Sequence, residues 1–188
     1  MFELAEWQRQ AVALKFPDKA VINGQHCAAQ SGQTFAAINP ATGQLLANVA
    51  ACGEDDVDAA VANARQVFEA GTWAQRPPAE RKQVLLRLAD LLMEHREELA
   101  LLDSLNMGKP VMDAYNIDVP GAAGVFRWYA ESIDKLYDQI APGAVNVLAT
   151  ITREALGVGA AVVPWNFPLD MAAWKLAPAP PPHPALRG

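Results

Sequence analysis

Cysteine is scarce in this chain: its 188 residues include two, Cys27 and Cys52, which do not form a Cys-x-x-Cys pair. Two thiols are too few for a disulfide framework, and with three histidines they do not supply the clustered ligands of a zinc site. A catalytic thiol needs a neighbour that lowers its pKa. His26 adjoins Cys27, but neighbours in an extended segment point to opposite sides. We therefore interpret both cysteines as small buried hydrophobes and expect no metal site.

Basic clusters and long apolar runs are absent as well. The formal net charge is −6, and contact with phosphate backbones needs clustered Lys and Arg, so we expect no nucleic-acid partner. The uncharged, mostly apolar run at residues 155–169 contains Pro164 and is shorter than the roughly 20 apolar residues of a membrane span. The N-terminus carries Glu3 and Glu6 and no apolar signal region. These absences predict a cytoplasmic protein without a membrane partner.

The residues that are present predict a folded core, because 52% are hydrophobic and 19% are charged. Residues 20–40 combine an Asn23-Gly24 turn with alternating apolar positions, which predicts short antiparallel strands. Residues 55–70 begin with acidic side chains and precede Gly71, so they predict an amphipathic helix. The apolar face of that helix comprises Val57, Val61, Ala64, Val67 and Phe68.

Two further helices are predicted on either side of the Gly108-Lys109-Pro110 break. The first begins at Pro77-Pro78 and runs to about Asp103 as one helix. The second begins near Asp118 or Pro120 and runs to Tyr137. The side chains that we expect this second helix to bury are Val125, Trp128, Tyr129, Ile133 and Leu136.

From residue 142 onward the periodicity changes. Residues 145–151 alternate, which predicts a half-exposed strand, and residues 157–163 are continuously small and apolar, as in a central strand covered on both faces. The predicted class is therefore α/β. Gly157-x-Gly159 lacks the third glycine of a dinucleotide fingerprint and lies inside the expected strand, so it carries no cofactor argument.

Asn166 stands between two prolines in the sequence PWNFP. At the carboxyl end of a buried parallel strand it would lie where open α/β sheets bind ligands, and the prolines would restrict its orientation. A carboxamide donates N–H groups without titrating, so it can stabilise an oxyanion. The alternative is a turn asparagine that bonds its own backbone, and the spacing alone favours that alternative.

Residues 153–176, which contain PWNFP, resemble the signature of the NAD(P)-dependent aldehyde dehydrogenase superfamily, as do residues 38–50, 80–92 and 108–135. The resemblance implies the N-terminal part of a Rossmann-like cofactor domain with a helical layer, an incomplete fold. It divides the chain into residues 1–141 of the cofactor-binding domain, an oligomerisation-arm strand at 142–153, the first central strand, WNFP loop and helix at 154–177, and a proline-rich tail outside the family pattern at 178–188.

The opening residues and residues 127–138 further resemble the subgroup that acts on γ-glutamyl-γ-aminobutyraldehyde and 4-guanidinobutyraldehyde in polyamine and arginine breakdown. By this resemblance the full-length relative is a homo-oligomer that oxidises an aldehyde to the carboxylic acid with NAD or NADP, through a cysteine thiohemiacetal.

The resemblance also implies roles for individual residues. Asn166 becomes the oxyanion donor and Lys175 a proton-relay lysine, with a surface lysine as its alternative. The nicotinamide side of the cofactor is assigned to Val163, Pro164, Trp165 and Asn166. The aldehyde tunnel is assigned to Phe167, Asp170, Met171 and Trp174, which at helical spacing could equally be core or, for Asp170, a water-facing first-turn residue. Asp118 matches a monovalent-cation or substrate-amine position and is otherwise a helix N-cap.

The resemblance is incomplete at the end of the chain. The ribose lysine, the glutamate base and the nucleophilic cysteine of the family have no match, and neither Cys27 nor Cys52 fits the nucleophile motif. We expect the isolated chain not to oxidise aldehydes. The alternatives are a non-catalytic chain that joins full-length subunits through its arm, and a polyproline ligand formed by the tail. The family pattern stops abruptly after Ala179, and the Pro, Ala, Arg and Gly residues that follow are those that GC-rich codons yield when read out of frame. This predicts a frameshift or a misread base near that point, which sequencing of the locus would reveal.

Overall fold

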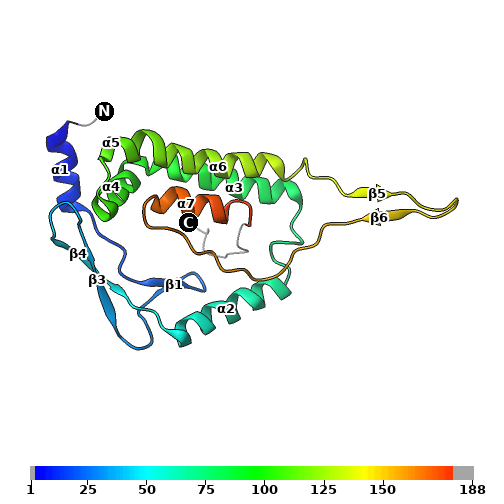
Figure 1. Ribbon diagram of the computed structural model, residues 1–188, viewed down its shortest axis with the longest axis horizontal. Coiled ribbons are helices and arrows are strands. Elements are labelled where there is room, and N and C mark those ends of the chain that lie inside the picture. Colours follow the sequence, from blue (N-terminus) through cyan, green and yellow to red (C-terminus); the bar gives the residue numbers. More distant parts are fainter. Residues whose placement is uncertain (1–2, 180–188) are drawn as a thin grey trace.

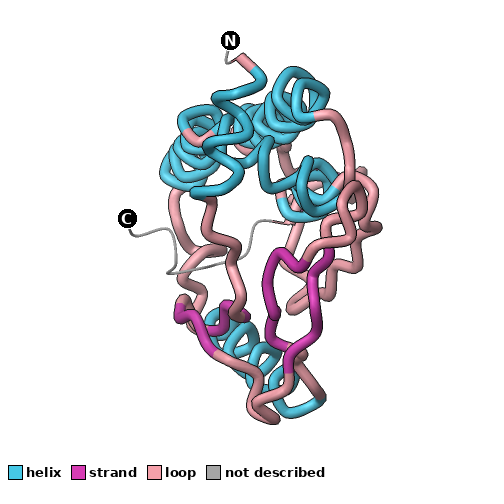
Figure 2. The backbone as a smooth tube through the Cα atoms, turned by 90° about the vertical axis from the view of Figure 1, so that its left-hand side faces the viewer, coloured by secondary structure: helices cyan, strands magenta, loops and turns pink. Residues whose placement is uncertain are grey.

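Most of the helices lie together on one side of the molecule, and the N-terminal strands lie with α2 on the other (Figure 1). The computed structural model describes residues 3–179, so most of the proline-rich tail, with its PxxP pattern, lies outside the described residues. Helices α3 (Pro78–Glu94), α6 (Val119–Ser132) and α7 (Pro168–Leu176) lie together, and α2 (Glu54–Glu69) lies below them (Figure 1). Figure 2 shows the helical and the strand-containing parts from one end. None of the helices within residues 3–179 is both long and apolar enough to cross a membrane.

The predicted antiparallel strands near the N-terminus are confirmed. Strands β1 (Ala20–Ile22) and β2 (Gln25–Cys27) pair antiparallel across Asn23 and Gly24. Both turn residues have positive φ, 53° and 70°, as a tight hairpin turn that matches strand twist requires.

A second hairpin follows from β3 (Thr34–Ile38) and β4 (Leu45–Ala50), with a bulge between Ala37 and Ile38. Its loop is closed by Asn39, whose Oδ1 accepts a hydrogen bond from the Ala41 backbone N–H at 2.9 Å.

Helix α2 confirms the predicted amphipathic helix. Its third residue, Asp56, is buried and accepts hydrogen bonds from the backbone N–H groups of Gly53 and Gln30, each at 2.9 Å. The carboxylate therefore caps the helix and ties it to the strands. The apolar face is less buried than expected, because Val57 and Val61 remain 55% and 48% exposed.

The prediction of one continuous helix from residue 77 to 103 is wrong. It is divided at His95 into α3 and α4 (Arg96–Met107). The Arg96 guanidinium lies 3.8 Å over the Tyr115 ring, and its Nε donates to the Tyr115 carbonyl at 2.6 Å. These are tertiary contacts at the first residue after the break, so the apolar periodicity of the sequence does not encode them.

The next predicted helix begins and ends earlier than expected. It starts with α5 (Val111–Asp113) and the π-helix η1 (Ala114–Asp118) and continues as α6 to Ser132. Trp128 and Leu136 are 64% and 68% exposed, so the prediction that both are core residues is wrong. The buried residues of the α3–α6–α7 core are mostly alanines, which allow close helix approach: Leu85, Ala89, Ala122, Ala123, Phe126, Ala130, Ala173 and Ala177.

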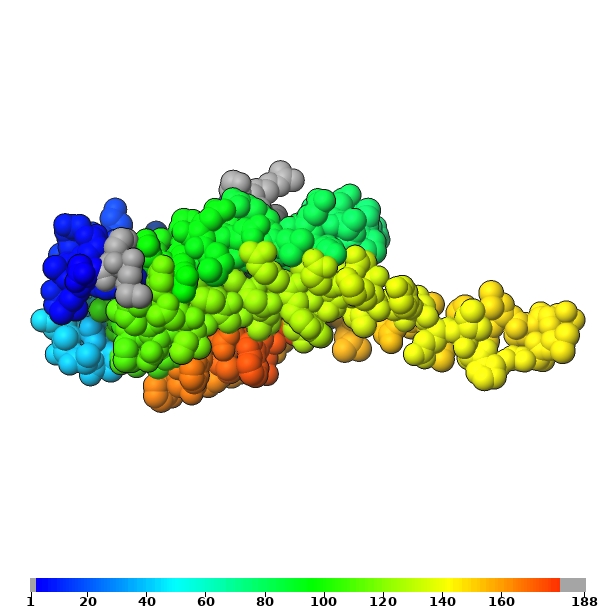
Figure 3. All heavy atoms as spheres, turned by 90° about the horizontal axis from the view of Figure 1, so that it is seen from above, coloured from blue at the N-terminus to red at the C-terminus, as the bar shows by residue number. Residues whose placement is uncertain are grey.

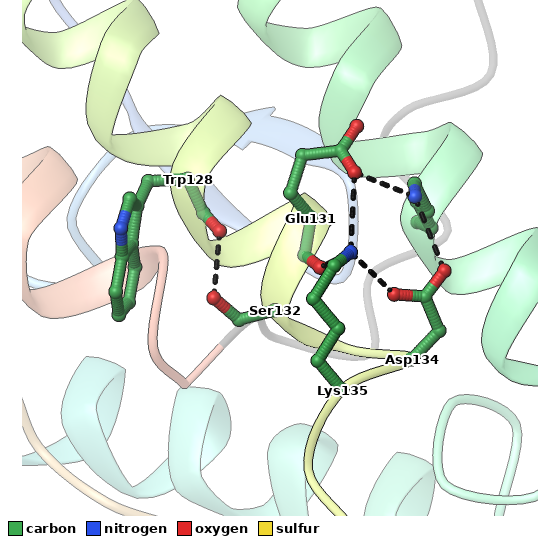
Figure 4. Close-up of polar contacts among 6 residues, drawn as sticks. Trp128, Glu131, Ser132, Asp134 and Lys135 are labelled. Carbon is green, nitrogen blue, oxygen red and sulfur yellow. Dashed lines mark hydrogen bonds and ion pairs between the residues drawn. The ribbon is translucent and has the colours of Figure 1, made fainter.

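A charged network joins the ends of α3 and α6. Lys82 Nζ contacts Glu131 at 2.7 Å and Asp134 at 3.1 Å, and Lys135 adds a contact to Asp134 at 2.9 Å. Figure 4 shows Glu131, Asp134 and Lys135 converging at the end of α6. The hydrogen bond from Lys82 lowers the pKa of Glu131, and the hydrogen bond from Lys135 lowers the pKa of Asp134.

The predicted arm strand is a hairpin. Strand β5 (Gln139–Ala141) pairs antiparallel with β6 (Ala149–Ile151), and residues 145–146 form a turn, so the prediction of one strand over 145–151 is wrong in extent. The hairpin projects from the body (Figures 1 and 3). At its base the Arg153 backbone N–H donates to Asp138 Oδ1 at 3.2 Å.

The central strand predicted at residues 157–163 does not form in this chain. Residues 152–164 carry no helix or strand, and Val162 is 87% exposed. A parallel strand covered on both faces needs paired strands and covering helices. The described residues form three two-stranded antiparallel sheets and no larger sheet, so this segment has neither.

Candidate active site at the start of helix α7

Asn166 lies exposed in the turn that leads into α7. Pro168 is the first residue of the helix, a position that suits proline because its missing N–H would have no partner there. Within residues 3–179 the Asn166 carboxamide has no hydrogen-bond partner. Asn39, which does bond its own loop, shows the behaviour of a turn asparagine in this chain. Asn166 therefore does not bond its own backbone as a turn asparagine would, and its N–H donors are free for a ligand.

The position of Asn166 adds the field of the helix to these donors. Helix α7 points its N-terminus toward the WNFP turn, and the unpaired N–H groups of a first helical turn give that end a partial positive charge. A developing negative charge beside Asn166 would be stabilised by both the amide and the helix end.

The three residues before Asn166 are also accessible. Val163 is 41% exposed and lies near the end of the run without helix or strand that closes at Pro164, whereas Trp165 is 77% exposed and begins the turn. Backbone groups that pair with no neighbouring strand can meet a ligand. This arrangement fits the assignment of these residues to a cofactor, which relies mainly on their backbone.

The four tunnel residues divide between two places. Trp174 lines a hollow of about 280 Å³ with Val125, Trp128 and Tyr129 of α6. Asp170 instead belongs to a buried charged cluster, and Phe167 adjoins it through Lys109. Met171 is half-buried on the same helix.

The α6 contribution to this hollow was missed by sequence reasoning, which placed Trp128 and Tyr129 in the core. Their rings meet edge to face, with centroids 4.8 Å apart. The spacing of Val125, Trp128 and Tyr129 identifies one helix face, but only the packing of α7 shows that this face borders a hollow.

The charged cluster lies beneath the WNFP turn and consists of Asp103, Lys109, Asp118 and Asp170. Lys109 forms an ion pair with Asp118, and their side chains are 12% and 4% exposed. Asp118 stands at the N-cap position of α6, but its side chain makes no capping bond there and pairs with Lys109 instead. No group of three or more His, Cys, Asp or Glu side chains within residues 3–179 could hold a metal ion. In this structure the cation beside Asp118 is the Lys109 ammonium.

Two carboxyls of the cluster have raised pKa values. Burial, followed by the negative charge of Asp118, raises the pKa of Asp103 to about 6. The same two causes raise the pKa of Asp170. A Cβ on Gly121 would stand 3.3 Å from Asp170 Oδ1, which places this carboxylate against the first turn of α6. Asp170 is therefore half-buried and does not simply face water.

Lys175 and the cysteines do not join the site within this chain. Lys175 is exposed in the last turn of α7, seven residues or roughly 10 Å along the axis from Pro168. Cys27 Sγ is 3.6 Å from the Ala20 carbonyl inside the first hairpin. Cys27 is half-buried and Cys52 is exposed, so the prediction that both are buried is wrong. Desolvation, followed by the charge of Asp56, raises the pKa of Cys52. A nucleophilic thiol needs a lowered pKa, so Cys52 is not activated.

The profile of the aldehyde dehydrogenase family matches residues 26–180. Over 93% of its length this chain is 52% identical to aminoacetaldehyde dehydrogenase of Pseudomonas aeruginosa, and it covers 35% of that relative. Over 94% of its length it is 48% identical to the NADP/NAD-dependent aldehyde dehydrogenase PuuC of Escherichia coli, of which it covers 36%. The chain thus spans about a third of the length of these relatives.

Solved structures agree. The γ-glutamyl-γ-aminobutyraldehyde dehydrogenase of Burkholderia cenocepacia superposes with a TM-score of 0.92 at 50% identity, with 94% of this chain and 36% of that one covered. The indole-3-acetaldehyde dehydrogenase AldA of P. syringae, in complex with NAD+, superposes with a TM-score of 0.94 at 48% identity and covers 95% of this chain and 36% of its own. With a family profile over most of its residues and this backbone match, the chain belongs to the aldehyde dehydrogenase family, of which it represents an N-terminal part.

Proposed function

We propose that the complete protein carrying this chain oxidises an aldehyde to a carboxylic acid with NAD+ or NADP+, and that Asn166 is the side-chain donor to the oxyanion. The observation that supports this most is the unpartnered Asn166 carboxamide at the positive end of α7. Because it does not titrate, the amide donates over the whole working pH range.

The residues present suit a nicotinamide cofactor, which when bound would supply the hydride acceptor. Val163, Pro164 and Trp165 would hold it along the exposed backbone before Asn166. Lys175 remains a proposed proton-relay residue, although its exposure agrees equally with a surface lysine.

This proposal is tested with a chimaera in which residues 3–177 of this chain replace the corresponding segment of the E. coli relative PuuC. We expect NAD(P)-linked aldehyde oxidation by the chimaera and none by the 188-residue chain purified free of host dehydrogenase, because neither Cys27 nor Cys52 fits the nucleophile motif of the family. An inactive but folded chimaera would contradict the proposed function. Turnover by the isolated chain would contradict the assignment of its cysteines.

For the substrate class we propose an ω-amino or guanidino aldehyde. Relatives of this chain act, by their names, on aminoacetaldehyde and γ-glutamyl-γ-aminobutyraldehyde. The cluster below the WNFP turn holds the carboxyls Asp103, Asp118 and Asp170 against the ammonium of Lys109. A second cation near Asp170 would reduce this excess of negative charge.

The substitution Asp170→Asn in the chimaera tests the substrate class. We expect kcat/KM for 4-guanidinobutyraldehyde to fall roughly tenfold or more, since a charge-assisted hydrogen bond is lost, while a neutral aldehyde of similar length is little affected. Asp58→Asn, at an exposed position of α2, is the matched control. An equal loss with both aldehydes would show that Asp170 serves the helix instead.

A second candidate, association with complete subunits, is favoured by the projecting hairpin. Its apolar side chains are exposed, with Val145 at 91% and Leu148 at 76%, and its strands have free edges. We propose that this hairpin adds to the sheet of another subunit.

Replacing Val147 and Leu148 with serine is expected to weaken capture of this chain by a full-length aldehyde dehydrogenase by about tenfold, because exposed apolar area is removed. Size-exclusion chromatography with light scattering measures the complex. The control is Val12→Ser, an equally exposed apolar residue on α1 (Leu4–Ala13). Equal binding by the hairpin variant and the parent chain would exclude the arm as the contact.

A further inference from the structure

Lys109 touches both the buried charges and the WNFP turn. Its Nζ is paired with Asp118 of η1 and also lies 3.7 Å from the centroid of the Phe167 ring. A cation over an aromatic face is attracted by the ring quadrupole, and the attraction grows when the cation is shielded from water. The ammonium thus joins η1 to the residue that follows Asn166.

The backbone of Lys109 is also held by specific contacts. Gly108 ends α4 with φ of 82°, a left-handed conformation that glycine adopts without strain. Ser104 Oγ donates to the Lys109 carbonyl at 2.6 Å. A Cβ on Gly108 would also stand 3.0 Å from Pro40 Cγ, so a larger residue here is disfavoured both by the positive φ and by this close contact.

Asp103 holds the other end of the same turn. Its carboxyl accepts a hydrogen bond from the backbone N–H of Leu169, which belongs to the first turn of α7 and has no partner within the helix. Asp103 and Lys109 therefore fix the two residues that flank Pro168, and both come from α4 and its end.

We infer that Lys109 is a positioning residue that holds Phe167, and through it the Asn166 carboxamide, with Asp118 and Asp103 fixing the ammonium and the first turn of α7. Asn166 itself has no bond that restrains it, so its orientation depends on its neighbours. The catalytic consequence rests on the proposed function, whereas the restraint of the turn does not.

Hydrogen exchange of the 188-residue chain, followed by mass spectrometry, tests the restraint. Lys109→Met alone would leave Asp118 as a buried unpaired charge and could unfold the chain, so the main variant is the double substitution Lys109→Met with Asp118→Asn. We expect the amides of Leu169 and Met171 to exchange about tenfold faster, with the α3 and α6 amides unchanged. Lys109→Arg keeps a cation that can stack and pair, and should restore the parent pattern.

The matched control is Lys82→Met. It also removes a paired ammonium, which contacts Glu131 and Asp134 and lies far from the WNFP turn in sequence. Unchanged exchange at Leu169 and Met171 in the double variant overturns the inference, and so does a uniform increase across all helices, which would indicate ordinary destabilisation. In the chimaera, the double variant should lower kcat about tenfold with KM nearly constant. If the parent chimaera is inactive, the proposed function fails, and the exchange experiment still decides the restraint.

Discussion

Asn166→Ala in the chimaera is expected to lower kcat by about 10²–10³-fold and to leave KM nearly unchanged, as the loss of one oxyanion donor does in other enzymes. We expect the amide to stabilise only the oxyanion that develops during the reaction, since the side chain is exposed and has no partner in the described chain. For the same two reasons its removal should not alter the thermal stability.

The control is Asn106→Ala, at an exposed position in α4. It should leave both kcat and the melting temperature unchanged. A loss of activity with Asn166→Ala that is accompanied by a fall in melting temperature would show that the asparagine is structural. Unchanged activity would remove it from the catalytic set.

Acidification from about pH 7.5 to pH 5 is expected to raise the contribution of Asp103 to the free energy of unfolding by about 1.4 kcal/mol. The folded pKa of Asp103 is raised from 3.8 to about 6. An acid with a raised folded pKa destabilises the folded state fully above that pKa, and the penalty disappears as the pH falls toward the ordinary value. The raised pKa of Asp170 acts in the same direction. The pKa values of Glu131 and Asp134 are lowered, so their stabilising contribution is lost as the pH falls from the ordinary carboxyl pKa through the lowered one.

Asp103→Asn should remove most of this pH dependence and raise the free energy of unfolding at pH 7.5 by about 1–2 kcal/mol, because a buried charge is lost while the amide oxygen still accepts the Leu169 N–H. Urea unfolding of the 188-residue chain at several pH values measures both effects. Asp58→Asn is the exposed control. A parent chain whose stability between pH 5 and 7.5 is flat, or falls on acidification, would contradict a raised pKa at Asp103.

Local chemistry in the sequence determined the elements that depend on neighbours along the chain. The Asn23-Gly24 turn, the acidic start of α2 and its end at Gly71 were all readable, because turn φ angles, helix caps and helix dipoles involve residues within a few positions. The family was predicted from the sequence motif around PWNFP, and the family profile and the backbone match confirm it.

The tertiary structure alone decided which residues meet across the chain. The apolar run at 157–163 reads as a buried strand, yet a strand exists only when partners supply its hydrogen bonds, and the described residues supply none. Lys109 appeared only as part of a helix break, because an ion pair with Asp118 and a ring contact with Phe167, far along the sequence, follow from the packing of α4, η1 and α7. Periodicity reports which face of an element is apolar; which other element covers that face is decided by the free energy of packing the whole chain.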